Sequence, residues 1–376
     1  MTSTPPHTQR SKGFKIAILI LAPIMGLLLL ELGFRVRAHY RNSRTLDQVR
    51  EVPAEPEVGG RTRFVDIIRP NANDKIIYDL RPNLDTTFKG KKLTTNSVGF
   101  RDPERVFDAQ ENEITIVGIG ASMMFAHGLA DGEGYMPRIE IKLNNRYSGH
   151  KWRVINTSAP SYNVVMKVET LIQRGLAYKP DLVLLNIAGN NLDLPQYIRT
   201  RQDPLATNRS FLLDFFGDRE GRKTLGEERM AEMAWVDRKA ISWDSGAVTS
   251  PEQIPEQYRD LVGWAPFRVA LDKLKALSEK HDFEVIVFAF IEHDLVPSML
   301  EEGRQRGFHI ISLMDDLDAY LIKNTGAAFD IENYKSSKLV VSPFNLHPSR
   351  LQHRMAVDRL LEDMDSMKII ERLMLR

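Results

Sequence analysis

A serine that follows a buried strand is the first candidate for chemistry in this chain. The apolar run Ile114–Gly118 predicts a strand, and Ser122 comes four residues after it, within the sequence Gly-Ile-Gly-Ala-Ser-Met-Met-Phe. A dinucleotide-binding loop would need glycine at position 123, and a nucleophile elbow would need glycine at position 124, but methionine stands at both. Ser122 is therefore either a reactive serine in an unusual loop or a residue that caps a helix N-terminus.

Three further groups of polar residues stand at comparable places in the chain. Residues 156–163 (Asn-Thr-Ser-Ala-Pro-Ser-Tyr-Asn) follow a second predicted strand, and residues 189–191 (Gly-Asn-Asn) follow a third. His347 stands shortly before the last predicted helix. In a parallel sheet, ligands bind at the carboxyl ends of the strands. The loops after the predicted strands are therefore expected at one edge of the sheet.

In this order, the four blocks resemble those of the SGNH/GDSL hydrolase family. Residues 95–102 (TNSVGFRD) are similar to a stretch that often precedes the first strand in membrane-anchored bacterial members. The resemblance extends from about Leu93 to Met367, without an insertion described below. It implies an ester-hydrolysing or acyl-transferring site, with no cofactor and no metal.

The resemblance also implies a role for each matching residue. Ser122 corresponds to the nucleophile and His347 to the general base. The donors of the oxyanion hole correspond to the backbone N–H of Ser122, to Ser161 at the place of the family's glycine, and to Asn191 at the place of the family's asparagine. A histidine that takes the serine proton, together with convergent N–H donors for a tetrahedral oxyanion, supplies what acyl transfer needs.

The chain departs from the family pattern at three positions. Ala121 replaces an aspartate that is mainly structural, and Ser161 replaces a glycine, which is compatible with an N–H donor if the backbone does not need positive φ. Asn345, two residues before His347, stands where the family has aspartate. An amide can orient the imidazole but cannot stabilise an imidazolium by its charge. Asp193 is an alternative source of that charge.

The remaining histidines are weaker candidates. His127 is expected to be a solvated loop residue, with a place in the site as the alternative. The pair His293 and Asp294 is expected in a solvated loop, with substrate contact as the alternative. His347 and His353 do not share a helix face, so no metal site is predicted.

Composition excludes several classes of function. Lysine plus arginine (51) and aspartate plus glutamate (50) nearly cancel, so no global field recruits nucleic acid. The chain has no cysteine, which excludes disulfides, thiolate metal sites, a cysteine nucleophile and a lipoprotein anchor.

The N-terminal region carries a long apolar segment. Residues 16–34 are long enough to cross the hydrocarbon core as a helix, with Glu31 near one end, and Arg35 and Arg37 follow where a signal peptide would have its cleavage site. We expect an uncleaved anchor, and the alternatives are a cleaved signal peptide and a buried core helix. Basic residues flank both ends, so charge does not decide the orientation, but long domains are translocated largely regardless of charge.

The expected organisation is a tail, an anchor, a linker and a large domain with an extension before it. The boundaries are residues 1–15 for a cytoplasmic tail, 16–34 for the anchor, 35–75 for a juxtamembrane linker, 76–110 for a small β-rich extension, and 111–376 for the hydrolase-like domain. Residues 197–266 form an insertion within that domain, rich in charge and in aromatic residues. These aromatics would either form a lid over the substrate or pack the insertion onto the core.

Strands and helices alternate through the large domain. Predicted strands are 114–118, 152–156, 181–188, 284–290 and 309–313, and predicted helices are 135–145, 164–175, 267–281, 299–306 and 351–367. This alternation predicts a three-layer α/β/α fold with a central parallel sheet. The family resemblance makes it the flavodoxin-like fold of the SGNH hydrolases.

These observations favour a serine ester hydrolase or acyl (acetyl) transferase in the bacterial inner membrane, with its large domain in the periplasm. From the resemblance and the anchor, its substrate would be an acylated small molecule or the O-acyl groups of an envelope polysaccharide. The alternative is a catalytically inactive relative that binds carbohydrate or serves as a scaffold in an envelope assembly. A nucleotide-binding domain is a further alternative, and its only support is the pair of glycines Gly118 and Gly120. The sequence does not specify the oligomeric state.

Overall fold

The computed structural model describes residues 12–42, 62, 64–195, 197–199, 205, 207, 210–213, 233–235, 258–292 and 295–376. The chain forms two units. One comprises Met1–Leu46 with Thr200–Glu232, and the other comprises Asp47–Arg199 with Met233–Arg376. Each is described by itself.

A five-stranded parallel sheet lies at the centre of the larger unit. Its strands are β5 (Glu113–Ile119), β6 (Lys151–Asn156), β7 (Leu182–Ile187), β10 (Glu284–Ala289) and β11 (His309–Ser312). Their spatial order is β11-β10-β7-β5-β6, and every neighbouring pair is parallel. Counted along the chain this is the flavodoxin-like order, in which ligands bind where the order reverses, here between β5 and β7. The predicted fold class and all five predicted strands are confirmed.

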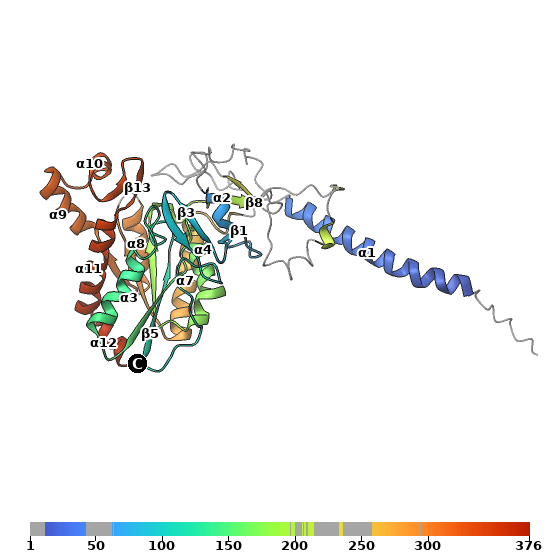
Figure 1. Ribbon diagram of the computed structural model, residues 1–376, viewed down its shortest axis with the longest axis horizontal. Helices are drawn as coiled ribbons and strands as arrows, with labels where there is room; N and C mark the ends of the chain where they lie inside the picture. Colours follow the sequence, from blue (N-terminus) through green and yellow to red (C-terminus); the bar gives the residue numbers. More distant parts are fainter. Residues whose placement is uncertain are drawn as a thin grey trace, which may run out of the picture. The chain divides into compact units, whose positions relative to one another are not determined.

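Helices cover both faces of this sheet (Figure 1). Helices α3 and α11 contact each other on one face, while α4 and α7 contact each other on the other. Helix α8 packs against α7 and against β10 and β11. The bounds are α3 (Tyr135–Arg146), α4 (Val164–Thr170), α7 (Trp264–His281), α8 (Val296–Gln305) and α11 (Arg350–Ser366). Helix α4 continues through a π-helical turn, Leu171–Gly175, and a 3₁₀ turn, Leu176–Tyr178.

The sequence pattern explains this layering. All six residues of β7 are buried, as expected of a central parallel strand with helices on both faces. Helix α7 instead buries Phe267, Ala270, Leu271 and Leu274, which recur at the three- and four-residue spacing of one helix face. Burial of these apolar side chains is the main force that holds the layers together.

The extension before the sheet begins earlier than predicted. It contains α2 (Phe64–Ile67) and two short antiparallel pairs, β1 (Ile68–Pro70) with β2 (Tyr78–Leu80) and β3 (Asp85–Phe88) with β4 (Lys91–Thr94). Phe64 and Ile67 are buried, so the prediction that residues 35–75 are all linker is wrong at its C-terminal end. The two residues are too few to show a periodic pattern in the sequence, although they pack with the extension.

A glycine fixes a tight turn in the extension. Gly99 has φ +86°, and a Cβ atom there would lie 2.6 Å from the carbonyl oxygen of Leu80. Only glycine meets both demands without strain. The side chain of Asn96 completes the turn, because its Oδ1 accepts from the backbone N–H of Phe100 at 2.8 Å.

The segment after β11 contains elements that were not predicted. They are α9 (Met314–Thr325), α10 (Ile331–Ser336), the antiparallel pair β12 (Val340–Ser342) and β13 (Asn345–Pro348), and the C-terminal α12 (Ile369–Met374). Strand β13 carries both Asn345 and His347, so this short pair sets the position of the predicted base.

The smaller unit contains α1 (Lys12–Asn42), whose segment Leu19–Arg37 is long and apolar enough to cross a membrane. The helix continues beyond Phe34, so the first part of the predicted linker is helical. Glu31 accepts hydrogen bonds from the hydroxyl of Ser210 at 2.9 Å and from the backbone N–H of Leu212 at 2.8 Å. These contacts join α1 to part of the predicted insertion.

The described residues of the predicted insertion also include 258–266, in which Tyr258, Leu261 and Val262 are buried. Strands β8 (Tyr197–Arg199) and β9 (Met233–Trp235) form an antiparallel pair within its bounds. Phe215, Phe216 and Trp243, which were among the aromatic residues considered for a lid, lie outside the described residues.

Candidate active site

Ser122 lies in a series of turns that follows β5 at the carboxyl edge of the sheet. The backbone N–H of His127 donates to the Ser122 carbonyl at 3.0 Å, which closes the turn on itself. The next helix, α3, begins only at Tyr135, after Gly134. Ser122 therefore does not cap a helix, and within the described part of the chain its side chain makes no hydrogen bond. The hydroxyl is partly exposed.

The two glycines before Ser122 serve packing. A Cβ atom at Gly120 would collide with the side chain of Met124, and one at Gly118 would collide with Met124 and with the Met136 methyl group. Met124 is fully buried over the end of β5. The Gly-x-Gly spacing is thus explained by the space that this methionine needs, which removes the only basis for the nucleotide-binding alternative.

Arg101, from the extension, holds the Ser122 turn from outside. One nitrogen of its guanidinium donates to the carbonyl oxygen of Phe125 at 2.6 Å and to that of Ala126 at 3.1 Å, and another donates to that of Leu129 at 2.7 Å. The carboxylate of Asp131 accepts from its Nε at 2.9 Å. A guanidinium can bind several acceptors at once, so one side chain holds three carbonyl groups of this turn, of which that of Ala126 also accepts from the backbone N–H of Leu129 at 3.0 Å.

His347 is oriented by Asn345. The Nδ1 atom of His347 and Oδ1 of Asn345 are 2.7 Å apart. An amide oxygen can only accept, so Nδ1 carries the proton and Nε2 keeps its lone pair. This is the tautomer that a general base requires. The hairpin fits closely against the Ser122 turn, because a Cβ atom at Gly128 would lie 2.8 Å from Nδ2 of Asn345.

His127 brings His347 to the turn that carries Ser122. The two imidazole rings are stacked, with centroids 4.3 Å apart and planes 13° from parallel. Nδ1 of His127 is buried and has no hydrogen-bond partner among the residues described. The prediction of a solvated loop histidine is therefore wrong. A stack between residues so far apart in the chain leaves no local pattern from which it could be predicted.

Both stacked histidines are held in the neutral state. Burial, with a further contribution from the positive charge of Lys89, lowers the pKa of His347 to about 4. Burial, followed by the charges of His347, Lys89 and Arg101, holds the pKa of His127 well below its usual range. At neutral pH the ring of His347 is therefore available to accept a proton.

Ser161 occupies a backbone conformation that favours glycine. It lies in the loop between β6 and α4 with φ +67°. The position does require positive φ, contrary to the condition expected for a serine donor, and Ser161 adopts this conformation at a cost of roughly 1–2 kcal/mol for a residue with a side chain. Its N–H therefore still has the backbone conformation that a glycine would give it. Tyr78 of the extension holds this loop, since its hydroxyl donates to the Pro160 carbonyl at 2.8 Å and its own carbonyl accepts from the Tyr162 hydroxyl at 2.6 Å.

Asn191 lies in a 3₁₀ turn, Gly189–Leu192, directly after β7. Its side chain is buried, and its Nδ2 donates to the carbonyl oxygen of Ala188. Its Oδ1 accepts from Nζ of Lys167 at 2.5 Å. Lys167 was not among the predicted site residues, although its place in the apolar run Val-Val-Met-Lys-Val indicated a buried charge.

Other candidates do not join this group. In the described part of the chain no hydrogen bond links Ser122 to His347, although such bonds are often long in the absence of substrate. The backbone carbonyl of Asp193 accepts from Asn163 at 3.0 Å, and no described contact links its carboxylate to His347. His353 is a core residue, whose Nδ1 accepts from the backbone N–H of Tyr135. His293 and Asp294 lie outside the described residues.

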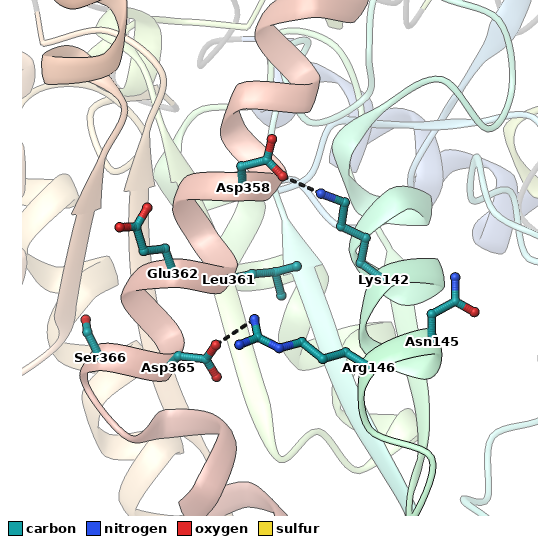
Figure 2. A pocket seen from close by; sticks show the side chains of 8 residues that line it. All are labelled: Lys142, Asn145, Arg146, Asp358, Leu361, Glu362, Asp365 and Ser366. Carbon is teal, nitrogen blue, oxygen red and sulfur yellow. Dashed lines mark hydrogen bonds and ion pairs between the residues drawn. The ribbon is translucent and has the colours of Figure 1, made fainter.

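A surface groove of about 740 Å³ lies between α3 and α11, away from these loops. Figure 2 shows Lys142 and Arg146 on α3 reaching across it to Asp358 and Asp365 on α11. Its lining residues are in the C-terminal parts of both helices, whereas Ser122 precedes α3 and His347 precedes α11. The groove therefore belongs to the opposite end of the sheet.

Comparisons with known proteins give structural likenesses only. No family model matches the chain, and no curated protein matches it. Among solved structures, a lipase/acylhydrolase from Enterococcus faecalis is 12% identical, with 68% of this chain and 96% of that chain covered at a TM-score of 0.38. An acetyl xylan esterase from Geobacillus stearothermophilus is also 12% identical, with 69% and 97% covered at a TM-score of 0.38. At these values the matches add nothing to what the strand order already shows.

Burial is the main cause of the low His347 pKa, and the charge of Lys89 adds to it. Replacement of Lys89 by methionine removes a positive charge near the ring, so we expect His347 to titrate above its wild-type value of about 4. Side-chain NMR titration of the full chain in detergent micelles measures this shift. The exposed Lys91 in the neighbouring strand is the matched control, and Lys91→Met should leave the titration where it was. An equal effect of the two variants would show that Lys89 has no specific role.

Proposed function

We propose that the chain is a serine ester hydrolase or acyl transferase in which Ser122 is the nucleophile and His347 the general base. The observation that carries this proposal is the arrangement of His347. Its ring is fixed by Asn345 at 2.7 Å, is held in the tautomer of a base, and is stacked on His127 from the same turn as Ser122. That turn lies at the switch point of the sheet, where ligands of this fold bind.

In the proposed reaction, Oγ of Ser122 attacks the carbonyl carbon of an ester while Nε2 of His347 accepts its proton. A tetrahedral intermediate forms, and its collapse returns the proton to the departing alcohol and leaves an acyl-serine. Water then releases the acid in a hydrolase, whereas a second alcohol takes the acyl group in a transferase. The two outcomes differ only in the acceptor that enters the site.

Three donors are proposed for the oxyanion of that intermediate. They are the backbone N–H of Ser122, the backbone N–H of Ser161 and the side-chain amide of Asn191. No backbone carbonyl of a described residue accepts from the N–H of Ser122, which supports its role. Such donors stabilise charge that develops only in the transition state, and the loss of one typically costs about 10²–10³ in kcat.

Asn345 sets the expected level of activity. Its amide oxygen orients His347 as an aspartate would, but it supplies no negative charge to the imidazolium that forms during proton transfer. The proposed enzyme is therefore a slow one compared with a complete triad. The alternative proposal is an inactive carbohydrate-binding or scaffold protein, which the strained Ser161 and the uncharged Asn345 favour.

The proposed location is the bacterial inner membrane, with the large unit on the periplasmic side. Helix α1 supports this through the length and composition of Leu19–Arg37. An anchored enzyme outside the cytoplasm would meet acylated components of the envelope, so O-acyl groups of an envelope polysaccharide are the proposed substrate class. Membrane placement and the family resemblance are the two supports for that class.

The nucleophile is tested by covalent labelling. A fluorophosphonate probe should label the full chain in detergent micelles, and Ser122→Ala should abolish both labelling and hydrolysis of an aryl acetate, because no other group would then form the acyl intermediate. Ser158→Ala is a matched control, since Ser158 is a buried serine whose hydroxyl is bound to Asn156. Persistent labelling of the Ser122→Ala chain would identify a different nucleophile, and absence of turnover in the wild type would favour the binding role.

The role of Asn345 is tested by Asn345→Asp. The new carboxylate should stabilise the imidazolium, so the rate should rise by up to about 10⁴. It should also raise the pKa of His347 from about 4. Because the protonated ring cannot act as a base, kcat/KM falls as the pH falls through this pKa, and the acid limb should move to higher pH in the variant. Asn345→Leu is the control that removes the acceptor. If the rate and the pH profile of all three proteins coincide, Asn345 does not act through His347.

The orientation is tested with reporters fused after Arg376. Alkaline phosphatase, which is active only outside the cytoplasm, should give activity, and a reporter that is active only in the cytoplasm should not. The reverse result would place the large unit inside the cell, and release of a shortened soluble chain would identify residues 16–34 as a cleaved signal peptide.

A further inference from the structure

Lys167 is a buried cation whose described neighbours include no carboxylate. It lies on α4, its side chain is only 1% exposed, and its Nζ donates to the backbone carbonyl of Asn186 at 2.8 Å and to Oδ1 of Asn191 at 2.5 Å. Lysine is almost never fully buried without an opposite charge, because removal of the ammonium group from water is costly. A lysine buried against neutral acceptors therefore indicates a function other than stability.

The contact with Lys167 determines which way the Asn191 amide faces. As an ammonium, Nζ carries only donors, so it requires the oxygen of the carboxamide and excludes its nitrogen. The amide nitrogen is therefore turned away from Lys167, where one of its hydrogens is given to the carbonyl oxygen of Ala188. One hydrogen of Nδ2 remains for another acceptor. Without Lys167, the hydrogen bond to Ala188 alone would oppose a half-turn of the amide, which would present its oxygen in place of that hydrogen.

Both charge states of Lys167 can make these two contacts. Burial lowers its pKa to about 7. The neutral amine has two hydrogens for the two described acceptors, the oxygens of Asn186 and Asn191, but it also has a lone pair that can accept from an amide N–H. The ammonium is therefore the form of Lys167 that enforces the orientation of the Asn191 amide.

We propose that Lys167 is a positioning residue, which fixes the carboxamide of Asn191 so that its N–H, and not its oxygen, is offered to the oxyanion of the bound ester. This inference rests on the proposed function, which makes Asn191 a donor of the oxyanion hole. Lys167 acts from behind that donor and touches no reacting atom. The requirement for a fixed amide explains why a buried lysine is kept beside the turn that follows β7.

The experiment compares Lys167→Met with Lys167→Gln in the full chain in detergent micelles, with hydrolysis of an aryl acetate as the readout. Methionine keeps an unbranched side chain, one atom shorter, but donates nothing, so kcat should fall by about 10²-fold with little change in KM, as for the loss of an oxyanion donor. Glutamine retains an N–H donor without charge and should restore a substantial part of the rate. Arg153→Met is the matched control, because Arg153 is a buried cation that donates to the Tyr178 carbonyl at 3.1 Å.

A double-mutant cycle decides whether Lys167 acts through Asn191. In an Asn191→Ala background, Lys167→Met should cause no further loss of kcat, because the group that it positions is absent. Multiplicative losses would overturn the proposal. So would an equal loss of kcat in Lys167→Met and Arg153→Met at matched melting temperature, since that result shows a structural role alone.

A second measurement keeps this inference separate from the proposed function. In protein labelled with ¹⁵N-asparagine, the side-chain amide signals of Asn191, assigned by their loss in Asn191→Ala, should shift in Lys167→Met and return toward the wild-type position in Lys167→Gln. If the wild type has no Ser122-dependent turnover but these shifts occur, the hydrolase proposal fails and the orientation of the amide stands. If the signals do not move, the positioning role fails whatever the activity.

Discussion

The hydrogen bonds from Arg101 to the backbone of the Ser122 turn are the interaction on which the geometry of the candidate site depends. The turn is not a helix, so its carbonyl groups lack the regular partners that helical residues have, and the guanidinium binds those of Phe125, Ala126 and Leu129. These hydrogen bonds fix the backbone segment that carries His127, whose ring stacks on that of His347. The small extension before the sheet thus positions the candidate site, although it holds none of the proposed reacting groups.

The charges around the candidate site affect the proposed ester chemistry in two opposite ways. Described interactions place the cations of Lys89, Arg101 and Lys167 near the proposed reacting groups, while Asn345 brings no negative charge to His347. This environment disfavours the imidazolium, so the proposed proton transfer from Ser122 would be slow. The same positive environment favours a developing oxyanion. The proposed mechanism therefore depends more on stabilisation of the oxyanion than on a charged triad.

The sequence predicts those parts of the molecule whose pattern is local. The apolar run Ile114–Gly118 and its four counterparts predict the strands of the sheet, and their alternation with helices predicts the layers. The order of four motif blocks locates the serine and histidine loops at one edge. Three contacts could not be predicted, because each joins residues distant in sequence. They are the stacking of His127 on His347, the hydrogen bonds from Arg101 to the Ser122 turn, and the contact of Lys167 with the amide of Asn191. The hairpin of β12 and β13 was missed because its strands are only three and four residues long.

The placement of His347 in the C-terminal hairpin has a consequence for biosynthesis. His347 follows Ser122 by about 225 residues, and translation adds roughly 5–20 residues per second, so about 10–45 s separate the emergence of the two. Arg101 precedes Ser122, so the Ser122 turn and the guanidinium that binds it are made before Asn345 and His347. A nascent chain therefore carries the Ser122 turn for this interval without the imidazole ring that stacks on His127. In the proposed mechanism, a chain that has not yet reached His347 has the nucleophile without its base and is inactive.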